Sequence, residues 1–326
     1  MEKQVKRPQY YGQLLGASVG IAAVIVLMLL AFMAPMMNSG SKDLPLAIAG
    51  PDLMVETISA QLTQSSPGAF DIEQVADAET AREMIMDREA IGAIIASPEG
   101  TRILVAGAAG TPYKQLLSTM AQAMQAQAQG VPANIVVEDI APLNEGDPQG
   151  LGLSLLALPL AFGGMASGVM FSRLTKRRLL DQLLSVTAVA IMGGLCVAGI
   201  LNAYGTITGE YLAVTVAVAV GIAAISLTVQ ALESLWGYAG IGLAAVLMIF
   251  IANSLSGIAT GAQWLPSPWG AIGQAMPIGA TGTLIRNISF FDGNAIATPL
   301  IVLSCWIIAA VAILWASNFK RSRVIA

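Results

Sequence analysis

Polar side chains are scarce in the long apolar runs of this chain, and the few that occur there are the first residues to which chemistry can be assigned. An unpaired polar group in hydrocarbon is costly, so such residues usually face a protein interior or a water-filled path. The path candidates are Asn202, Gln230, Asn253, Ser254 and Ser256, and Trp264 and Arg286 join them as gate candidates. Alternatively, the polar residues hydrogen-bond a neighbouring helix, or Arg286 extends to lipid headgroups.

Residues typical of common enzyme sites are missing from the sequence. The chain has no histidine, no cluster of cysteines with metal-ligand spacing and no G-x-x-x-x-G-K-[ST] phosphate loop. Histidine-based catalysis, common zinc sites and ATP hydrolysis therefore lack their residues. We expect no enzyme activity, no catalytic residue, no metal and no cofactor in this chain, and any ATP with its Mg²⁺ to be held by a partner subunit.

The composition indicates an integral membrane protein. Hydrophobic residues make up 56% of the chain and charged residues 11%, against about 25% charged residues in soluble domains. Between Lys42 and Asp147 there are 15 acidic but 5 basic residues, whereas basic residues gather near both termini and after Ser172. Such basic clusters set orientation or touch anionic lipid, and no nucleic-acid partner is indicated.

Charge patterning predicts which segments lie on each side of the membrane. An uncharged run between Asp147 and Arg173 is long enough to cross a membrane, and it ends in a basic loop. Short basic loops stay in the cytoplasm, so this end is predicted inside. The basic residues 1–13 precede a first span at 14–37 and are also predicted to be cytoplasmic, which places 38–149 outside.

The remaining apolar runs complete a prediction of six transmembrane helices within 14–37 and 150–318. The fifth is expected at Tyr238–Ile258, and the sixth at Ala297–Asn318 is followed by a basic cytoplasmic tail, 319–326. Residues 264–291 alternate apolar patches with proline and glycine, which predicts a re-entrant outer segment, or alternatively a loop on the outer surface. The glycines of Gly164-x-x-x-Gly168 suit close helix packing within the bundle, or alternatively a dimer contact.

The acidic outer segment is predicted to fold as an α/β domain. Period-two and apolar patterns indicate strands, separated by helical stripes. The strands are expected at Leu44–Ala49, Phe70–Val75, Ala90–Ala96, Ile103–Ala106 and Asn134–Ile140. The helical stripe that includes Met120 and Met124 is interpreted as core, with a docking face as the alternative. The predicted fold class is an α-helical polytopic membrane protein with an inserted extracytoplasmic α/β domain.

This plan resembles the permease subunits of type-2 ABC exporters, particularly the branch of YhgE and phage-infection-protein-like membrane proteins. Beyond the span order, the resemblance is carried by Leu265-Pro266, Met276-Pro277 and Leu284-Ile285-Arg286 before the last span, and by the strand and proline turn of residues 90–98. The resemblance implies export of an amphiphilic or polymeric substrate, a second permease subunit as a homo- or heterodimer, and a separate cytoplasmic ATPase. The alternative is a non-transporting membrane receptor or scaffold that displays the outer domain.

An ATPase partner would need a contact on the cytoplasmic side, and similar permeases use their first cytoplasmic loop. The expected coupling residues are Arg173, Lys176, Arg177, Arg178 and Asp181. Alternatively, the four basic residues only fix the orientation of the chain. The expected location is the cell membrane, with several spans, lipid contacts and both termini in the cytoplasm.

Overall fold

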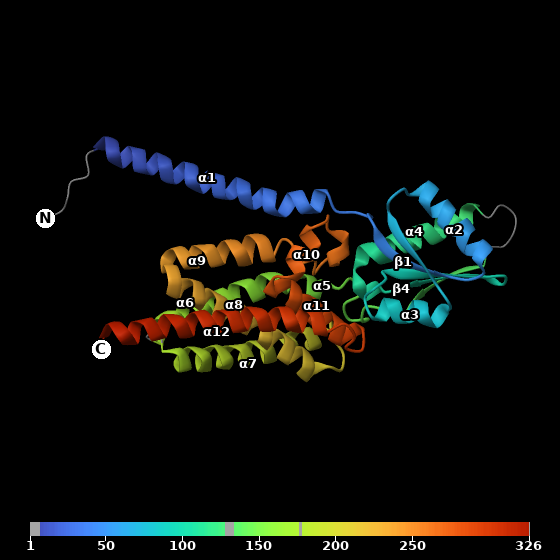
Figure 1. Ribbon diagram of the computed structural model, residues 1–326. Coiled ribbons are helices and arrows are strands. Elements are labelled where there is room, and N and C mark those ends of the chain that lie inside the picture. The colour runs from blue at the N-terminus through green and yellow to red at the C-terminus, as the bar shows by residue number, and fades with distance from the viewer. Residues whose placement is uncertain (1–6, 128–133, 176–177, 326) are drawn as a thin grey trace.

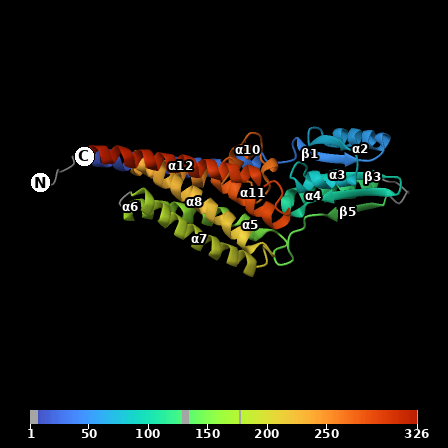
Figure 2. The same cartoon turned by 60° about the horizontal axis from the view of Figure 1, so that its bottom comes forward.

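The computed structural model describes residues 7–127, 134–175 and 178–325. The chain forms a long helical bundle with a five-stranded sheet unit at one end (Figure 1). Helix α1 begins and helix α12 ends at the end of the bundle that is remote from the sheet unit (Figures 1 and 2). The sheet unit is formed by the chain between α1 and the second long helix.

The sheet has the strand order β2-β1-β3-β4-β5. Its strands are β1 (Leu44–Ala49), β2 (Phe70–Val75), β3 (Gly92–Ser97), β4 (Gly100–Val105) and β5 (Ile135–Asp139). All neighbouring pairs are parallel except β3 and β4, which form an antiparallel hairpin with Ser97 opposite Gly100. The five predicted strands are therefore confirmed, and β1 and β2 have the predicted bounds.

Helices cover both faces of the sheet. Helices α2 (Asp52–Ser65) and α4 (Thr111–Gln127) pack on one face, where Val55 and Leu117 are buried against the strands. Helix α3 (Ala78–Met86) packs on the other face through Ala81 and Ile85. Met120 and Met124 pack against the first of these two cores, which confirms their interpretation as core residues.

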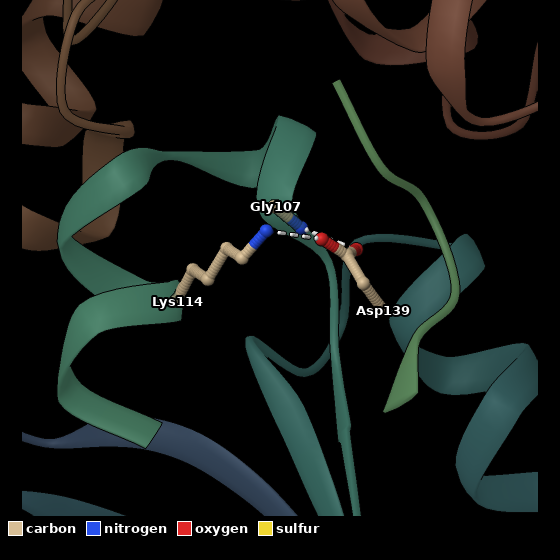
Figure 3. A network of polar contacts seen from close by, with 3 residues as sticks. All are labelled: Gly107, Lys114 and Asp139. Carbon is tan, nitrogen blue, oxygen red and sulfur yellow. Dashed lines mark hydrogen bonds and ion pairs between the residues drawn. The ribbon is translucent and has the colours of Figure 1, made fainter. Parts of the chain in front are cut away.

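A carboxylate ties the start of α4 to the end of the sheet. Asp139, the last residue of β5, accepts a hydrogen bond of 2.9 Å from the backbone N–H of Gly107 (Figure 3). Its other oxygen pairs with Nζ of Lys114, also at 2.9 Å. Gly107 opens a 3-10 turn, η1 (Gly107–Ala109), and a side chain there would collide with the carboxylate. This contact fixes the direction in which α4 leaves the sheet.

Among the described residues, five helices are long and apolar enough to cross a membrane. They are α1 (Arg7–Met37), α5 with α6 (Leu151–Ser154 and Ala157–Leu174), α7 (Leu179–Ala203), α8 (Tyr211–Trp236) and α12 (Ala297–Ile325). Helix α8 lies at the centre and contacts α6, α7 and α12. Gly164 and Gly168 of α6 face Ile225 and Val229 of α8, so this glycine pair serves packing within the bundle.

The expected fifth span at Tyr238–Ile258 is shorter in the structure. Helix α9 (Tyr238–Ala245) continues as a π-helix, η2 (Val246–Ala252), and the apolar helix ends there. Beyond it, the Ser254 hydroxyl bonds back to the carbonyl of Phe250, and Gly257 has a φ of 64°. The Ser254 side-chain hydrogen bond and the left-handed conformation of Gly257 are both unfavourable for a continuing helix. The helical segment is therefore shorter than the span that its composition predicts.

The proline-rich segment after η2 is built from short helices. They are η3 (Ala262–Trp264), α10 (Trp269–Gln274) and α11 (Pro277–Phe290). Helix α11 contacts α8 and α12, and most of its residues are buried. The predicted break in the apolar run is therefore present, and α11 lies inside the protein instead of on its surface.

Candidate functional site

An apolar cavity lies between α1 and the short helices. Its volume is about 820 Å³. Leu30 of α1, Phe250 of η2 and Trp269 of α10 line it, and Asn38 and Ser254 are its polar lining residues. The amide of Asn38 donates to the carbonyl of Ala34, so one donor at this end is already used by the helix backbone. The cavity thus has long apolar walls and a small polar region.

Helix α1 leaves this cavity accessible because it hardly packs on the bundle. From Tyr11 to Leu30 its side chains are exposed, and it contacts the bundle mainly at η2. Figure 1 shows α1 running alongside the other helices as a separate rod. A ligand that enters from the side of the bundle therefore meets few side chains before the cavity.

Ser256 and Asn253 hold the turn after η2 rather than face the cavity. The hydroxyl of Ser256 donates to the carbonyl of Asn253 at 3.0 Å, and the carbonyl of Ser256 accepts from Nε2 of Gln274 at 2.8 Å. Thr283 of α11 then donates to Oε1 of Gln274 at 2.6 Å. Of the three predicted path residues in this turn, Ser254 alone lines the cavity. The Ser256 hydroxyl thus bonds within its own turn and not to a neighbouring helix.

Two further path candidates, Asn202 and Gln230, lie elsewhere in the bundle. Gln230 of α8 is fully buried, and neither polar atom of its side chain has a hydrogen-bond partner among the described residues. Asn202 is exposed near the end of α7. The structure therefore does not bring these two residues to the cavity.

Trp264 and Arg286 meet the sheet unit at a junction between the two parts of the protein. The Trp264 ring packs edge-on against Tyr113 of α4, with centroids 5.7 Å apart and planes at 75°. A guanidinium N–H of Arg286 donates to the carbonyl of Ile258, and the arginine is 5% exposed. The alternative that Arg286 extends to lipid headgroups is therefore wrong.

Two residues of the sheet unit complete this junction. The guanidinium of Arg88 lies 4.5 Å from the ring centroid of Phe291, which is fully buried at the end of α11. Burial raises the pKa of the Tyr113 hydroxyl to about 12 and lowers the pKa of Arg88. We call Arg88, Tyr113, Arg286 and Phe291 the junction cluster. Sequence reasoning did not identify Arg88 and Tyr113 as neighbours of Trp264 and Arg286, because more than 150 residues separate the two regions in the chain.

Gly110 and Gly261 permit the close approach at the junction. A Cβ atom at Gly110 would lie 2.4 Å from the carbonyl oxygen of Thr260, and one at Gly261 would lie 2.4 Å from the Tyr113 ring. Gly261 also has a φ of 88°, a conformation that other residues rarely adopt. Glycine at these two positions lets the sheet unit sit directly on the turn before η3.

The predicted coupling residues lie at the other end of the bundle. Arg173 at the end of α6 lies 5.0 Å from the ring centroid of Tyr238, at the start of α9. Arg178 is exposed before α7, and Asp181 lies in the first turn of α7, where a carboxylate suits the helix dipole. Lys176 and Arg177 lie outside the described residues.

The Arg173–Tyr238 contact joins two segments that the sequence treats separately. It places the last turn of α6 beside the start of α9, next to the exposed side chains of Leu235 and Trp236. Leu180 is also exposed, whereas Thr175 is buried and donates to the carbonyl of Phe171. This end therefore presents positive charge beside exposed apolar and aromatic side chains.

Comparisons of the chain with models of protein families, with curated proteins and with solved structures find no match. The resemblance to exporter permeases therefore stays a prediction from the sequence. The structure itself defines a helical protein with five apolar helices of spanning length and a small α/β unit.

Proposed function

We propose that this protein is the membrane-spanning subunit of an ABC-type exporter that moves an amphiphilic substrate outward. A separate ATPase would supply the energy, and a second permease subunit would complete the transporter. In this proposal the short helix α9–η2 serves as a sixth pass and the sheet unit lies outside the cell membrane. Both termini would then be cytoplasmic, in agreement with α1 beginning and α12 ending at the same end of the bundle.

The cavity beside α1 is the observation that carries this proposal. Its volume of about 820 Å³ falls within the range of roughly 300–1,000 Å³ that is typical of ligand sites. Apolar walls with a polar region at Asn38 and Ser254 suit a molecule with a hydrocarbon part and a polar head. The cavity borders the broken segment 253–286, and irregular backbone at membrane depth is tolerated where it lines a cavity.

A binding measurement tests the cavity. Ala31 lines it, so Ala31→Trp should fill it, whereas Ala23→Trp places the same ring on an exposed part of α1 away from the cavity. Binding of dansyl-undecanoic acid to the purified full-length protein would be followed by the rise in dansyl fluorescence. We expect binding by the wild type and by Ala23→Trp, and at least a tenfold weaker binding by Ala31→Trp. Equal binding by all three proteins would contradict the proposal.

The ATPase partner is tested at the opposite end. Asp181→Arg reverses one charge beside Arg178 without touching the bundle core, and Asp71→Arg makes the same change on the exposed strand β2. After purification in mild detergent, the wild type and Asp71→Arg should retain a nucleotide-binding subunit, and Asp181→Arg should lose most of it. Labelling of a cysteine placed at Ser66 would verify that the sheet unit still lies outside.

The alternative function is a membrane scaffold that displays the sheet unit. It is favoured by a hollow of about 530 Å³ between that unit and the loop after α11, where the carboxylates of Glu79, Glu83, Asp87 and Asp292 outnumber the one cation, Arg82. Such a hollow suits a cationic partner. A scaffold predicts that no ATPase co-purifies and that Ala31→Trp has no effect, so the two experiments above separate the functions.

A further inference from the structure

A second cavity adjoins the apolar cavity beside α1. Its volume is about 500 Å³, and it lies between the linker from α1 to β1 and residues 262–274. Asn38 and Pro266 line both cavities, so the two cavities meet at these residues. Helix α10 separates them elsewhere, because its Ile272 lines the apolar cavity and its Gln274 lines the second one. Figure 1 shows α10 beside the end of α1 that leads into the sheet unit.

The second cavity has charged side chains, which the apolar cavity lacks. Lys42 and Asp43 line it just before β1 begins, and both are exposed. Neither forms an ion pair with any residue that the structure describes. The linker that carries them is held in place, since the backbone N–H of Gly40 donates to the carbonyl of Trp264 at 3.1 Å. The second cavity thus offers one cation and one carboxylate to a ligand.

This combination of groups suits a head group that carries both charges. A phosphate can accept from the ammonium of Lys42 and from the side-chain amide of Gln263, which also lines the cavity. An ammonium group can pair with the carboxylate of Asp43 and lie against the ring of Trp264, another lining residue. A head group with a single charge would use only one of the two charged side chains.

We propose that the second cavity binds the head group of a zwitterionic amphiphile, with its phosphate at Lys42 and its ammonium at Asp43 and Trp264. The hydrocarbon chain then passes Asn38 and lies in the apolar cavity beside α1. This inference rests on the proposed function, because it specifies which class of amphiphile the apolar cavity takes. It also sets the orientation of the ligand, with the head group next to the sheet unit.

Displacement of a fluorescent probe tests the head-group site. The full-length protein, held in a non-ionic amphipol, would be loaded with dansyl-undecanoic acid. Dodecylphosphocholine, dodecyl phosphate and dodecyltrimethylammonium would then compete with the probe, each below its critical micelle concentration. The three competitors have the same hydrocarbon chain and differ in the charge of the head group, so a difference between them reports on the second cavity.

Two conservative variants remove the charges one at a time. Lys42→Gln removes the cation and Asp43→Asn removes the carboxylate. Asp43 has a φ of 49°, a left-handed conformation that asparagine also tolerates, so Asp43→Asn keeps the backbone. Arg102→Gln and Asp71→Asn make the same changes of charge at exposed positions of the sheet unit that do not line the cavity, so they control for net charge.

A third variant fills the second cavity. Gly40 lines it, and no atom lies within 4 Å of the position that a Cβ would take, so Gly40→Trp has room for its first side-chain atom. Gly16→Trp is the matched control, because Gly16 is exposed on α1, is equally unobstructed and lies away from both cavities.

The zwitterion should displace the probe from the wild type and from all three controls at a roughly fivefold lower concentration than either singly charged competitor, since it uses both charged side chains. Lys42→Gln and Asp43→Asn should each reduce this advantage roughly 2- to 5-fold, a modest factor because both side chains are exposed. In Gly40→Trp the three competitors should act at similar concentrations.

The results separate the two proposals. If the probe binds and Ala31→Trp weakens it, but the zwitterion has no advantage over the singly charged competitors, the head-group site is wrong and the apolar cavity stands. The same conclusion follows if Lys42→Gln and Asp43→Asn both keep the full advantage, or if Arg102→Gln and Asp71→Asn lose it equally. Failure of the probe to bind the wild type would overturn both proposals. If Gly40→Trp does not fold, the two charge variants decide.

Discussion

Replacement of Gly261 by alanine should destabilise the junction. At φ 88° an alanine is strained, and its Cβ would lie 2.4 Å from a ring carbon and from the hydroxyl oxygen of Tyr113. The backbone strain costs about 1–3 kcal/mol. Tyr113 is 1% exposed and cannot swing into solvent, so overpacking adds roughly 1–3 kcal/mol.

Gly293 provides a matched control for the strain alone. Its φ is 78°, and no atom lies within 4 Å of the position that a Cβ would take. Gly293→Ala should therefore cost only the backbone part, and the two variants should differ by the overpacking, about 1–3 kcal/mol. With about 2–4 °C per kcal/mol for a chain of this size, Gly261→Ala should melt several degrees below Gly293→Ala.

The assay combines thermal unfolding in detergent with hydrogen exchange. Exchange should accelerate in residues 108–113 and 258–265 of Gly261→Ala, because these segments meet at the displaced Tyr113 ring, and should stay at the wild-type rate in Gly293→Ala. Equal melting temperatures for the two variants, together with unchanged exchange at the junction, would refute the packing that the structure gives to Tyr113 and Gly261.

Three further predictions concern other contacts. Burial raises the pKa of Tyr113 from its ordinary 10.0 to about 12, so the folded protein keeps the phenol proton at a pH where the unfolded chain loses it. The free energy of unfolding should therefore be unaffected by this group below pH 10 and should fall between pH 10 and 12. Tyr113→Phe should remove this part of the decline when unfolding is measured as a function of pH. Gly168→Leu should push α6 from α8 and cost about 1–3 kcal/mol in detergent unfolding, whereas Gly163→Leu, with nothing within 4 Å, should be near neutral. Asp147→Ala should lower the free energy of unfolding by about 0.5–2 kcal/mol, because the Asp147 carboxylate accepts a hydrogen bond of 2.8 Å from the N–H of Leu151. Amide hydrogen exchange at the start of α5 should become faster in this variant. A wild-type exchange rate there would contradict the capping role of Asp147.

Local patterns explain why much of the fold could be predicted. The strands of the sheet unit alternate or run apolar over five or six residues, and Ser97 to Gly100 has the turn chemistry that closes a hairpin. Thr111 and Pro112 form the start of α4, and uncharged runs between acidic or basic residues mark the long helices. Each of these patterns is contained within a stretch of about 25 consecutive residues, so it can be recognised from the sequence without knowledge of distant contacts.

The same local patterns did not predict the length of the fifth apolar helix or the residues that surround the candidate site. The composition from Tyr238 to Ile258 suits a full span, but a π-helix and a left-handed glycine end the apolar helix at Ala252. Trp264, Arg286 and Ser254 could be singled out as unusual residues in apolar runs. Their surroundings could not be predicted, since Ser254 lines a cavity that α1 completes and Trp264 packs on Tyr113, about 150 residues earlier in the chain.

The sequence by itself thus determined the long apolar helices, the strands and the distribution of charge, because these follow from side-chain periodicity and from the cost of charge in hydrocarbon. Only the tertiary structure decided that Tyr113 packs against Gly261 and Trp264, and that a cavity remains beside α1. Such contacts depend on how complete elements pack in three dimensions, and residues that meet across two elements leave no periodic signal in either one.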